Sequence, residues 1–448
     1  MKFQNYILTV AICSLFACSN EDDPIKTLVI EPDATLSLVV DNGETSSLKM
    51  TKANEVADYG NLDKGIYSLT LAVFNQGAYE GIELGVLVAC KTATSKGGGC
   101  NNVEDVEVHS GPVEVMVLGN LSEFLQEKLA IGTTKLSDIT DGNFFANLDG
   151  EESQLTMSSA IHSVNIQTGK VNCMGYSNDE IKVKNEVDPS LSEDKYISLY
   201  QSSADKPGIK LYRNVARIQF KSITLSPLDE YSTDAKFTLK SLFVANAKSK
   251  TILASTDEWG KVEWTSINKE DWMCGQFAEE EGVLKNGEAI EYNNLLVELE
   301  EITASFGKKD AMNAQVNLDG PGTYSATERE QGVIGKTFYV YENADESEEA
   351  NHTLLVLFGT YTYTPKGETT PLNVDGYYAV TVNKPGEGKL EGVGNLAPYI
   401  KRNYNYSVNV TIKTPGAKKA YDPEINAYLS TSVKVEPWNV KNIHEDVE

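Results

Sequence analysis

The sequence predicts an all-β protein of two domains, and three observations support this. Short segments of alternating apolar and polar residues recur along most of the chain and stop at turn residues, as half-buried strands do. The length of 448 residues allows two domains of roughly 200 residues, each with its own core. A new run of strands begins after Lys206-Pro207-Gly208. We therefore expect an N-terminal domain over residues 50–208 and a C-terminal domain over residues 209–448.

The chain begins with an export signal that is not part of the fold. Lys2 supplies a positive charge, an apolar stretch follows from Tyr6 to Phe16, and Leu15-Phe16-Ala17-Cys18 has the form of a lipobox. The stretch is too short and wrongly flanked for a transmembrane helix. We therefore predict a lipoprotein signal peptide over residues 1–18, with a lipid such as palmitate on Cys18.

The charge of the chain limits its partners. Its 65 Asp and Glu residues outnumber its 39 Lys and Arg residues, which gives a formal net charge of -26. A surface this acidic repels phosphate backbones and anionic lipid headgroups. We therefore expect no nucleic-acid partner, and contact with a membrane only through the lipid of the precursor.

Two alternating segments near the ends of the chain are the candidate functional elements. The first has its apolar face at Ala34, Leu36, Leu38 and Val40. The last has its apolar face at Leu429, Thr431, Val433 and Val435, and after Pro437 the apolar residues fall at Trp438 and Val440, which predicts a kink or bulge. The two strands either compete for one groove or are ordinary edge strands of a sandwich.

One helix interrupts the strands of the N-terminal half. Ser122 is a candidate N-cap, and Gly132 is a stop signal. The apolar face of this predicted helix is formed by Leu121, Leu125 and Leu129. The segment between this helix and Lys206 shows no clear pattern.

Four of the six cysteines remain once Cys13 leaves with the signal peptide and Cys18 receives lipid. Cys90 and Cys100 flank a glycine-rich, hairpin-like loop, and they can pair in an oxidising envelope. Closing so short a loop would contribute on the order of 2 to 3 kcal/mol. A metal site is the alternative, but it lacks two further ligands at a suitable spacing. We therefore expect a disulfide between Cys90 and Cys100, and buried thiols at Cys173 and Cys274.

No catalytic residue, cofactor site or metal site is predicted. The four histidines have no metal-binding spacing, and the chain has neither a Gly-x-Ser-x-Gly elbow nor a P-loop. Acidic runs at residues 279–281 and 346–349 could be paired carboxylates or a calcium site, but such runs are usually solvated loops. Trp259, Trp264 and Trp272 either stack on sugars, if they are exposed, or cap a sandwich core.

Several of these segments, taken in order, resemble the landmarks of the FimA-type major fimbrillins, the subunits of type V pili. The landmarks run through nearly the whole chain, and each is weak alone. They are residues 70–77 (TLAVFNQG), 117–120 (VLGN), 213–217 (RNVAR), 353–359 (TLLVLFG), 376–380 (GYYAV) and above all 400–412 (IKRNYNYSVNVTI).

The resemblance implies two β-sandwich domains of transthyretin-like topology and assembly by strand exchange. In that family a surface protease removes the first strand together with the lipid, and the last strand of a neighbouring subunit takes its place. For this chain it implies a propeptide over residues 19–49 and a donor strand over residues 429–448, with Val433, Val435, Trp438 and Val440 as inserted side chains. Burying four or five such side chains gives a gross gain of about 6 to 15 kcal/mol.

The cleavage site departs from the family pattern. Those fimbrillins are cut after an arginine in the loop that follows the first strand, whereas this chain has no arginine before Arg213. The loop offers Lys49 first and Lys52 second. The alternative is that both lysines are solvated residues that are never cut.

Three functional hypotheses follow. The first is a stalk subunit of an adhesive fimbria at the cell outer membrane and surface, without catalysis, whose partners are copies of itself, anchor and tip subunits, and a surface protease. The second is a tip or accessory pilin, and the third is a monomeric glycan-binding lipoprotein. The strong alternation of the last strand favours the stalk subunit, because a stalk subunit needs a donor strand.

Overall fold

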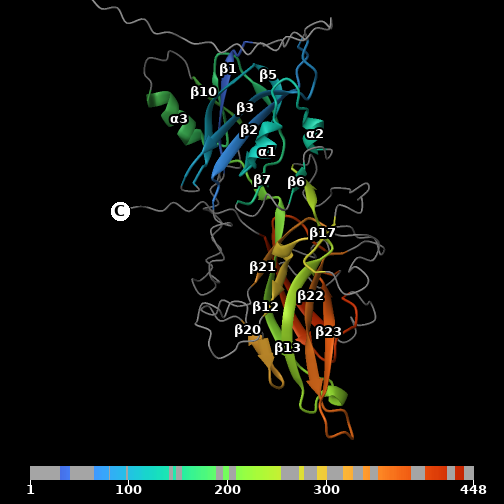
Figure 1. Cartoon of the computed structure of the whole chain (residues 1–448). Helices are drawn as coiled ribbons and strands as arrows, with labels where there is room; N and C mark the ends of the chain where they lie inside the picture. Colours follow the sequence, from blue (N-terminus) through green and yellow to red (C-terminus); the bar gives the residue numbers. More distant parts are fainter. Residues whose placement is uncertain are drawn as a thin grey trace, which may run out of the picture.

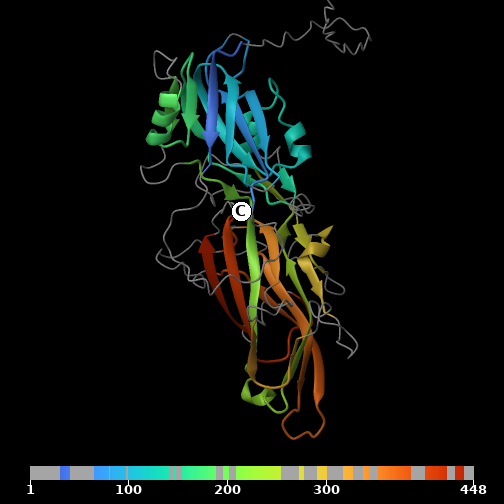
Figure 2. The same cartoon turned by 90° about the vertical axis from the view of Figure 1, so that its left-hand side faces the viewer.

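Two lobes stacked end to end make up the described part of the chain (Figure 1), and a view turned by 90° agrees (Figure 2). The computed structural model describes residues 31–40, 65–79, 81–96, 99–140, 145–147, 154–187, 195–200, 208–253, 272–276, 290–299, 316–325, 336–343, 352–384, 399–420 and 429–437. We call residues 31–213 the N-lobe and residues 215–437 the C-lobe. Asn214 connects them.

The N-lobe is a sandwich of two sheets. The first has the strand order β10-β9-β1-β4, and the second has the order β11-β7-β5-β2-β3 with β8 beside β5. The first sheet contains β1 (Ala34–Val39), β4 (Asn102–Val108), β9 (Val171–Met174) and β10 (Tyr196–Tyr200). The second contains β2 (Ser68–Asn75), β3 (Leu87–Thr94), β5 (Gly111–Gly119), β7 (Met157–Ser158), β8 (His162–Ile166) and β11 (Tyr212–Arg213).

Helices cover the outer faces of both N-lobe sheets (Figure 1). Helix α3 (Asn178–Val187) lies against the first sheet, where Ile181 packs with residues of β9. Helices α1 (Glu123–Glu127) and α2 (Leu136–Thr140) lie against the second sheet through buried leucines. The all-β prediction with a short helix in this half is therefore confirmed, although α2 and α3 had no clear signal in the sequence.

The predicted helix is present but shorter than expected. Ser122 is its N-cap, because its side chain accepts a hydrogen bond from the Leu125 amide. The helix ends at Glu127 and does not continue to Gly132. The Thr134 hydroxyl donates to the Lys128 carbonyl and accepts from the Ala130 amide, so a side chain replaces the next helical turn.

The C-lobe is a second two-sheet sandwich. One sheet has the order β20-β12-β24-β25 with β21 also on β12, and the other has the order β18-β13-β22-β23 with β19 also on β13. The first contains β12 (Val215–Leu225), β20 (Gly322–Ser325), β21 (Thr337–Tyr341), β24 (Tyr404–Ile412) and β25 (Leu429–Pro437). The second contains β13 (Lys236–Ala245), β18 (Leu296–Glu298), β19 (Val316–Leu318), β22 (Leu354–Tyr363) and β23 (Leu372–Thr381).

The remaining elements are short. Strand β6 (Phe145–Asn147) pairs with β15 (Lys250–Ile252), and β14 (Ala247–Lys248), β16 (Trp272–Cys274) and β17 (Ile290–Glu291) form a three-stranded sheet. Two 3₁₀ turns span Asp229–Tyr231 and Asn293–Leu295. The β6–β15 pair joins a segment from the N-terminal half of the chain to the C-lobe.

The two lobes repeat one topology. In chain order, β1, β2, β3, β4, β5, β8 and β9 of the N-lobe have the same neighbours and directions as β12, β13, β18 with β19, β20 with β21, β22, β23 and β24 of the C-lobe. The last strand breaks this correspondence. Strand β10 runs parallel to β9, whereas β25 runs antiparallel to β24.

Candidate strand-exchange site

The first predicted strand lies inside a sheet. Strand β1 pairs antiparallel with β4, from Ala34 opposite Val108 to Val39 opposite Asn102, and pairs parallel with β9. Beyond β1, Val40 forms a bridge with Ile209. Hydrogen-bonded neighbours therefore lie on both edges of β1, and the edge-strand interpretation is wrong for it.

The predicted apolar face of β1 enters the N-lobe core. Ala34, Leu36, Leu38 and Val40 are 8%, 0%, 0% and 2% exposed and pack between the two sheets. At roughly 1.5 to 3 kcal/mol for each larger side chain, this burial stabilises the lobe by about 5 to 10 kcal/mol. A small domain is stabilised in total by about 5 to 15 kcal/mol. The N-lobe therefore needs either β1 or a substitute in this position.

The backbone of β1 is held by contacts that the sequence did not predict. Asn172, which is fully buried, donates from its side-chain amide to the Thr35 carbonyl at 3.2 Å. Gly175 has a positive φ of 79°, and a Cβ at this position would lie 2.3 Å from the Val39 carbonyl oxygen. Only glycine permits this close approach. A buried asparagine and a left-handed glycine have local signals too common to single out in a sequence.

A polar latch holds the start of β1. Both carboxylate oxygens of Asp33 accept hydrogen bonds from Ser110, one from its amide and one from its hydroxyl, each at 2.6 Å. The Ser110 hydroxyl is the main cause that lowers the pKa of Asp33. The latch joins the residue before β1 to the turn between β4 and β5.

The last predicted strand lies at the edge of the C-lobe. Strand β25 pairs with β24 over its whole length, from Leu429 opposite Ile412 to Pro437 opposite Tyr404. Val433 is 5% exposed and belongs to the core, whereas Ser430 and Ser432 are exposed. By the register of the strand, the backbone of Val435 lies opposite Tyr406. Among the described residues, one neighbouring strand pairs with β25 and two pair with β1, so detaching β25 would break fewer backbone hydrogen bonds.

Residues 34–192 match the family model of the major fimbrial subunit protein (FimA). The predicted resemblance to the FimA-type fimbrillins is confirmed. The match begins at the first residue of β1 and covers most of the N-lobe.

Solved structures share the fold of this chain. A putative cell adhesion protein from Parabacteroides distasonis ATCC 8503 has a TM-score of 0.63 and 24% sequence identity, with 92% of this chain and 100% of that chain covered. A fimbrilin (FimA) from Porphyromonas gingivalis W83 has a TM-score of 0.57 and 20% sequence identity, with 92% of this chain and 99% of that chain covered. No curated protein matches the sequence. At these identities the structures show the fold alone, and together with the family model they support a fimbrial subunit.

The predicted disulfide between Cys90 and Cys100 is wrong. Cys90 and Cys100 are both free thiols. Cys90 lies opposite Ala72 on β2, whereas Cys100 donates its amide to the Ile66 carbonyl, so about six residues, or roughly 20 Å of strand, separate them. A disulfide requires Cα atoms within about 7 Å. The two thiols also pack against different cores, and burial raises the pKa of Cys90 to about 11.

The expectation of buried thiols at Cys173 and Cys274 is confirmed. Cys173 and Cys274 are buried free thiols, one in each lobe. Burial raises the pKa of Cys173 to about 11 and that of Cys274 to about 12. Neither thiol is therefore ionised at neutral pH.

Several predicted sites fall outside the described residues. They are the lipidation site Cys18, the cleavage candidates Lys49 and Lys52, the inserted residues Trp438 and Val440, the two acidic runs, Trp259 and Trp264. Trp272 is described and 7% exposed, with the Lys248 ammonium 3.9 Å from the ring centroid. Burial makes Trp272 unsuitable for stacking on a sugar.

Among the described residues, no three histidine, cysteine or acidic side chains come together in a way that could hold a metal ion. Within the same part of the chain, no helix has the length and apolar character needed to cross a membrane.

Proposed function

We propose that this protein is a structural stalk subunit of an adhesive cell-surface fimbria, exported as a lipoprotein and polymerised by strand exchange. Removal of β1 together with the lipid would open a groove between β4 and β9. The last strand of a second copy, residues 429–448, would then occupy that groove. Assembly would place the protein in a fimbrium on the outer membrane, with anchor and tip subunits and a maturation protease as further partners.

One observation carries the proposal: β1 is internal to its sheet, yet it is joined to the rest of the lobe through residues 41–64, which contain Lys49 and Lys52. Cleavage after either lysine would separate β1 from every later residue of the chain. The vacated position would expose two unpaired strand edges and the apolar core side chains of the groove. Such a surface favours the addition of a strand.

The last strand has the properties that a donor needs. It is extended over nine residues, and apolar and polar residues alternate along it. Ser430 and Ser432 are exposed, and Val433, on the opposite face of the strand, is buried. The spacing of Leu429, Thr431, Val433 and Val435 equals that of Ala34, Leu36, Leu38 and Val40. A donor from a second copy, with Val433, Val435, Trp438 and Val440 as its predicted inserted side chains, would therefore present alternate side chains to the sites that β1 fills.

The first test is the N-terminal sequence of protein sheared from the cell surface. We expect a start at Met50 or Ala53, with both β1 and the lipid absent. Lipidated Cys18 on all of the material would contradict the proposal and favour a monomeric surface-binding lipoprotein.

The second test is deletion of residues 433–448. We expect the shortened subunit to be exported and folded but unable to polymerise, because the donor is missing. Circular dichroism of the purified subunit checks the fold, and electron microscopy of the cells checks the filaments. Filaments of normal length from this variant would overturn the donor role of the last strand.

A further inference from the structure

Two matching dipeptides meet where the lobes join. The chain has only four arginines, and two of them, Arg213 and Arg402, are each 1% exposed and each followed by an asparagine. Arg213-Asn214 precedes β12, and Arg402-Asn403 precedes β24. These two strands are parallel neighbours, so the two dipeptides lie at the same end of the C-lobe sheet.

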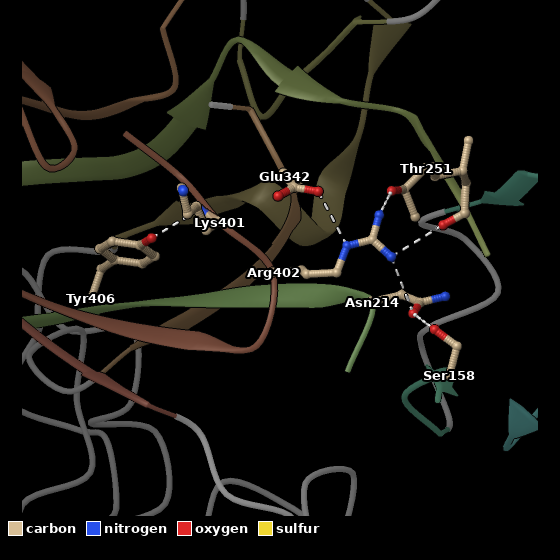
Figure 3. A network of polar contacts seen from close by, with 8 residues as sticks. Ser158, Asn214, Thr251, Glu342, Lys401, Arg402 and Tyr406 are labelled. Carbon is tan, nitrogen blue, oxygen red and sulfur yellow. Dashed lines mark hydrogen bonds and ion pairs between the residues drawn. The ribbon is translucent and has the colours of Figure 1, made fainter. Parts of the chain in front are cut away.

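The guanidinium of Arg402 is the centre of this cluster (Figure 3). Its Nε atom donates to the Glu342 carboxylate at 3.2 Å, and Glu342 is also 1% exposed. Its two terminal nitrogens donate to the Thr251 hydroxyl at 2.7 Å and the Ile252 carbonyl at 3.2 Å. A longer contact of 3.5 Å reaches the Asn214 side-chain oxygen.

These contacts continue from the C-lobe into the N-lobe. The Asn214 side-chain oxygen also accepts from the Ser158 hydroxyl on β7 at 3.0 Å, and the Asn214 amide donates to the Thr156 carbonyl at 2.9 Å. In the opposite direction, the Asn403 side chain accepts from the Arg213 amide at 3.2 Å, and the Asn403 amide donates to the Val215 carbonyl at 2.9 Å. The Asn214 side chain therefore contacts Arg402, and the Asn403 side chain contacts Arg213. These two contacts lie beside Asn214, the residue that connects the lobes.

Two further features hold the junction in one arrangement. Strand β15, which supplies Thr251 and Ile252, pairs with β6 from the N-terminal half of the chain. The loop that carries Arg402 is tied down by Tyr406, whose hydroxyl accepts from the Lys401 amide at 2.8 Å and donates to the Tyr399 carbonyl at 3.1 Å. Burial raises the pKa of Tyr406, so the hydroxyl remains neutral and keeps its proton for this bond.

The cluster is better suited to fixing a geometry than to adding stability. Burying a guanidinium and a carboxylate costs desolvation energy that their attraction does not always exceed. In addition, Oε1 of Glu342 and Nδ2 of Asn214 have no hydrogen-bond partner among the described residues. An apolar junction of the same volume would be at least as stable, but it would not specify the orientation of the two lobes through directional bonds.

We propose that this Arg-Asn cluster is an orientation clamp, which fixes the angle between the β1 position in the N-lobe and β25 in the C-lobe. The role in a filament rests on the proposed function. If each subunit receives a strand in its N-lobe and donates one from its C-lobe, the angle between the lobes repeats at every subunit. The clamp then determines the twist and the bending stiffness of the filament, and Arg402 is a positioning residue for assembly.

The test compares two changes at arginine–asparagine contacts between the same two strands. The double variant Arg402→Gln with Glu342→Gln removes both charges of the buried Arg402–Glu342 pair, so that neither is left unpaired. The matched control is Arg217→Gln, because Arg217 on β12 donates to Asn405 on β24 at 3.0 Å, and both of these residues belong to strands of the C-lobe. Arg402→Lys keeps the charge beside Glu342 but cannot reach the same set of acceptors.

Two measurements test the orientation of the lobes in the monomer and the geometry of the filament independently. Small-angle scattering of the monomer should show a wider range of lobe arrangements for the double variant, a smaller change for Arg402→Lys, and none for Arg217→Gln. Electron microscopy should then show that filaments of the double variant vary most in twist and lose most stiffness. Filaments of Arg402→Lys should change less, and those of Arg217→Gln should not change. A monomer of the double variant with the wild-type scattering profile would overturn the clamp.

Failure of the proposed function would give a different result. If the wild-type protein forms no filaments, the scattering measurement still tests the clamp in the monomer. If the double variant does not fold, Arg402→Lys provides the decisive comparison with Arg217→Gln. Equal scattering profiles from these two variants would likewise overturn the proposal.

Discussion

Strands β1 and β12 occupy the same position in the two lobes, but they differ in how they are held. Each is internal to its sheet, antiparallel to one neighbour and parallel to the other. Strand β1 spans six residues and is followed by residues 41–64, whereas β12 spans eleven residues and is followed directly by a described 3₁₀ turn and β13. The same place in the fold is therefore filled by a short, separable strand in one lobe and by a long, continuous strand in the other.

The last strands of the lobes show the complementary difference. Strand β10 is parallel to β9, and it lies on the N-lobe sheet beside α3. Strand β25 is antiparallel to β24 and ends the described chain at an open edge. Both last strands lie at the edge of their described sheets, so the two lobes differ in the length of the first strand and in the direction of the last strand. The proposed head-to-tail assembly needs lobes that differ, because two equivalent lobes would each offer both a groove and a donor.

The largest expected effect comes from removing β1. A chain that starts at Met50 should lose roughly 5 to 10 kcal/mol of N-lobe stability, because four core side chains and two ladders are missing. Hydrogen exchange should show lost protection in β4 and β9, with protection kept in β13 and β22. A peptide of residues 31–45 should restore protection, and a scrambled peptide should not. If the backbone amides of β4 and β9 stayed fully protected from exchange without the peptide, β1 would not be needed to hold its sheet together. The proposed difference between β1 and β12 would then be wrong.

The second prediction compares one buried side chain in each equivalent strand. Leu36→Ala on β1 and Ile218→Ala on β12 both truncate fully buried residues, and each should cost about 2 to 5 kcal/mol in its own lobe. Only Leu36→Ala should also speed the uptake of a fluorescent peptide of residues 429–448 into the precursor. Equal uptake by the two variants would mean that β1 is not the strand that the peptide displaces.

The third prediction concerns β25. Val433→Asp places a charge on the buried face, and we expect the strand to detach from β24 at a cost of about 1.5 to 3 kcal/mol, with loss of filaments. Ser432→Asp is the matched control, because Ser432 is exposed on the opposite face. Thermal unfolding measures the first effect and electron microscopy the second. Equal filament yields from the two variants would exclude Val433 from the donor face.

The alternation of the two terminal strands predicted which residues are buried, but not where the strands lie. A period of two identifies Ala34, Leu36, Leu38 and Val40 as one face, whatever the neighbours are. Whether a strand is internal or at an edge depends on long-range pairing. For β1 that pairing involves β4 and β9, and the sequence does not encode it locally.

The sequence failed to predict two features of the N-lobe, for different physical reasons. The glycines between Cys90 and Cys100 predicted a hairpin, yet β3 continues to Thr94 and the chain then crosses from one sheet to the other. Helix α3 has only Ile181 buried, so its apolar pattern is too weak to identify it. The Arg-Asn dipeptides were visible as landmarks, but their contact depends on the parallel pairing of β12 with β24.

The smallest expected effect is the pH dependence of the Asp33 latch, which β12 lacks because it follows directly from Asn214. The hydrogen bonds from Ser110 lower the pKa of Asp33 below its ordinary value of 3.8. A lowered pKa in the folded state means that the latch stabilises β1 fully above this ordinary value and is lost as the pH falls through the lower, folded value.

Uptake of the labelled peptide of residues 429–448 measures this latch. The uptake rate should be constant from neutral pH down to about pH 5 and should rise below about pH 4, where Asp33 becomes protonated. Asp33→Asn should remove most of this rise, because an amide has no charge to lose, and Ser110→Ala should raise uptake at neutral pH. Both effects should be modest, because the latch is exposed to solvent. An unchanged acid profile in Asp33→Asn would assign the pH dependence to other carboxylates, and β1 would then be held by its side chains and ladders alone.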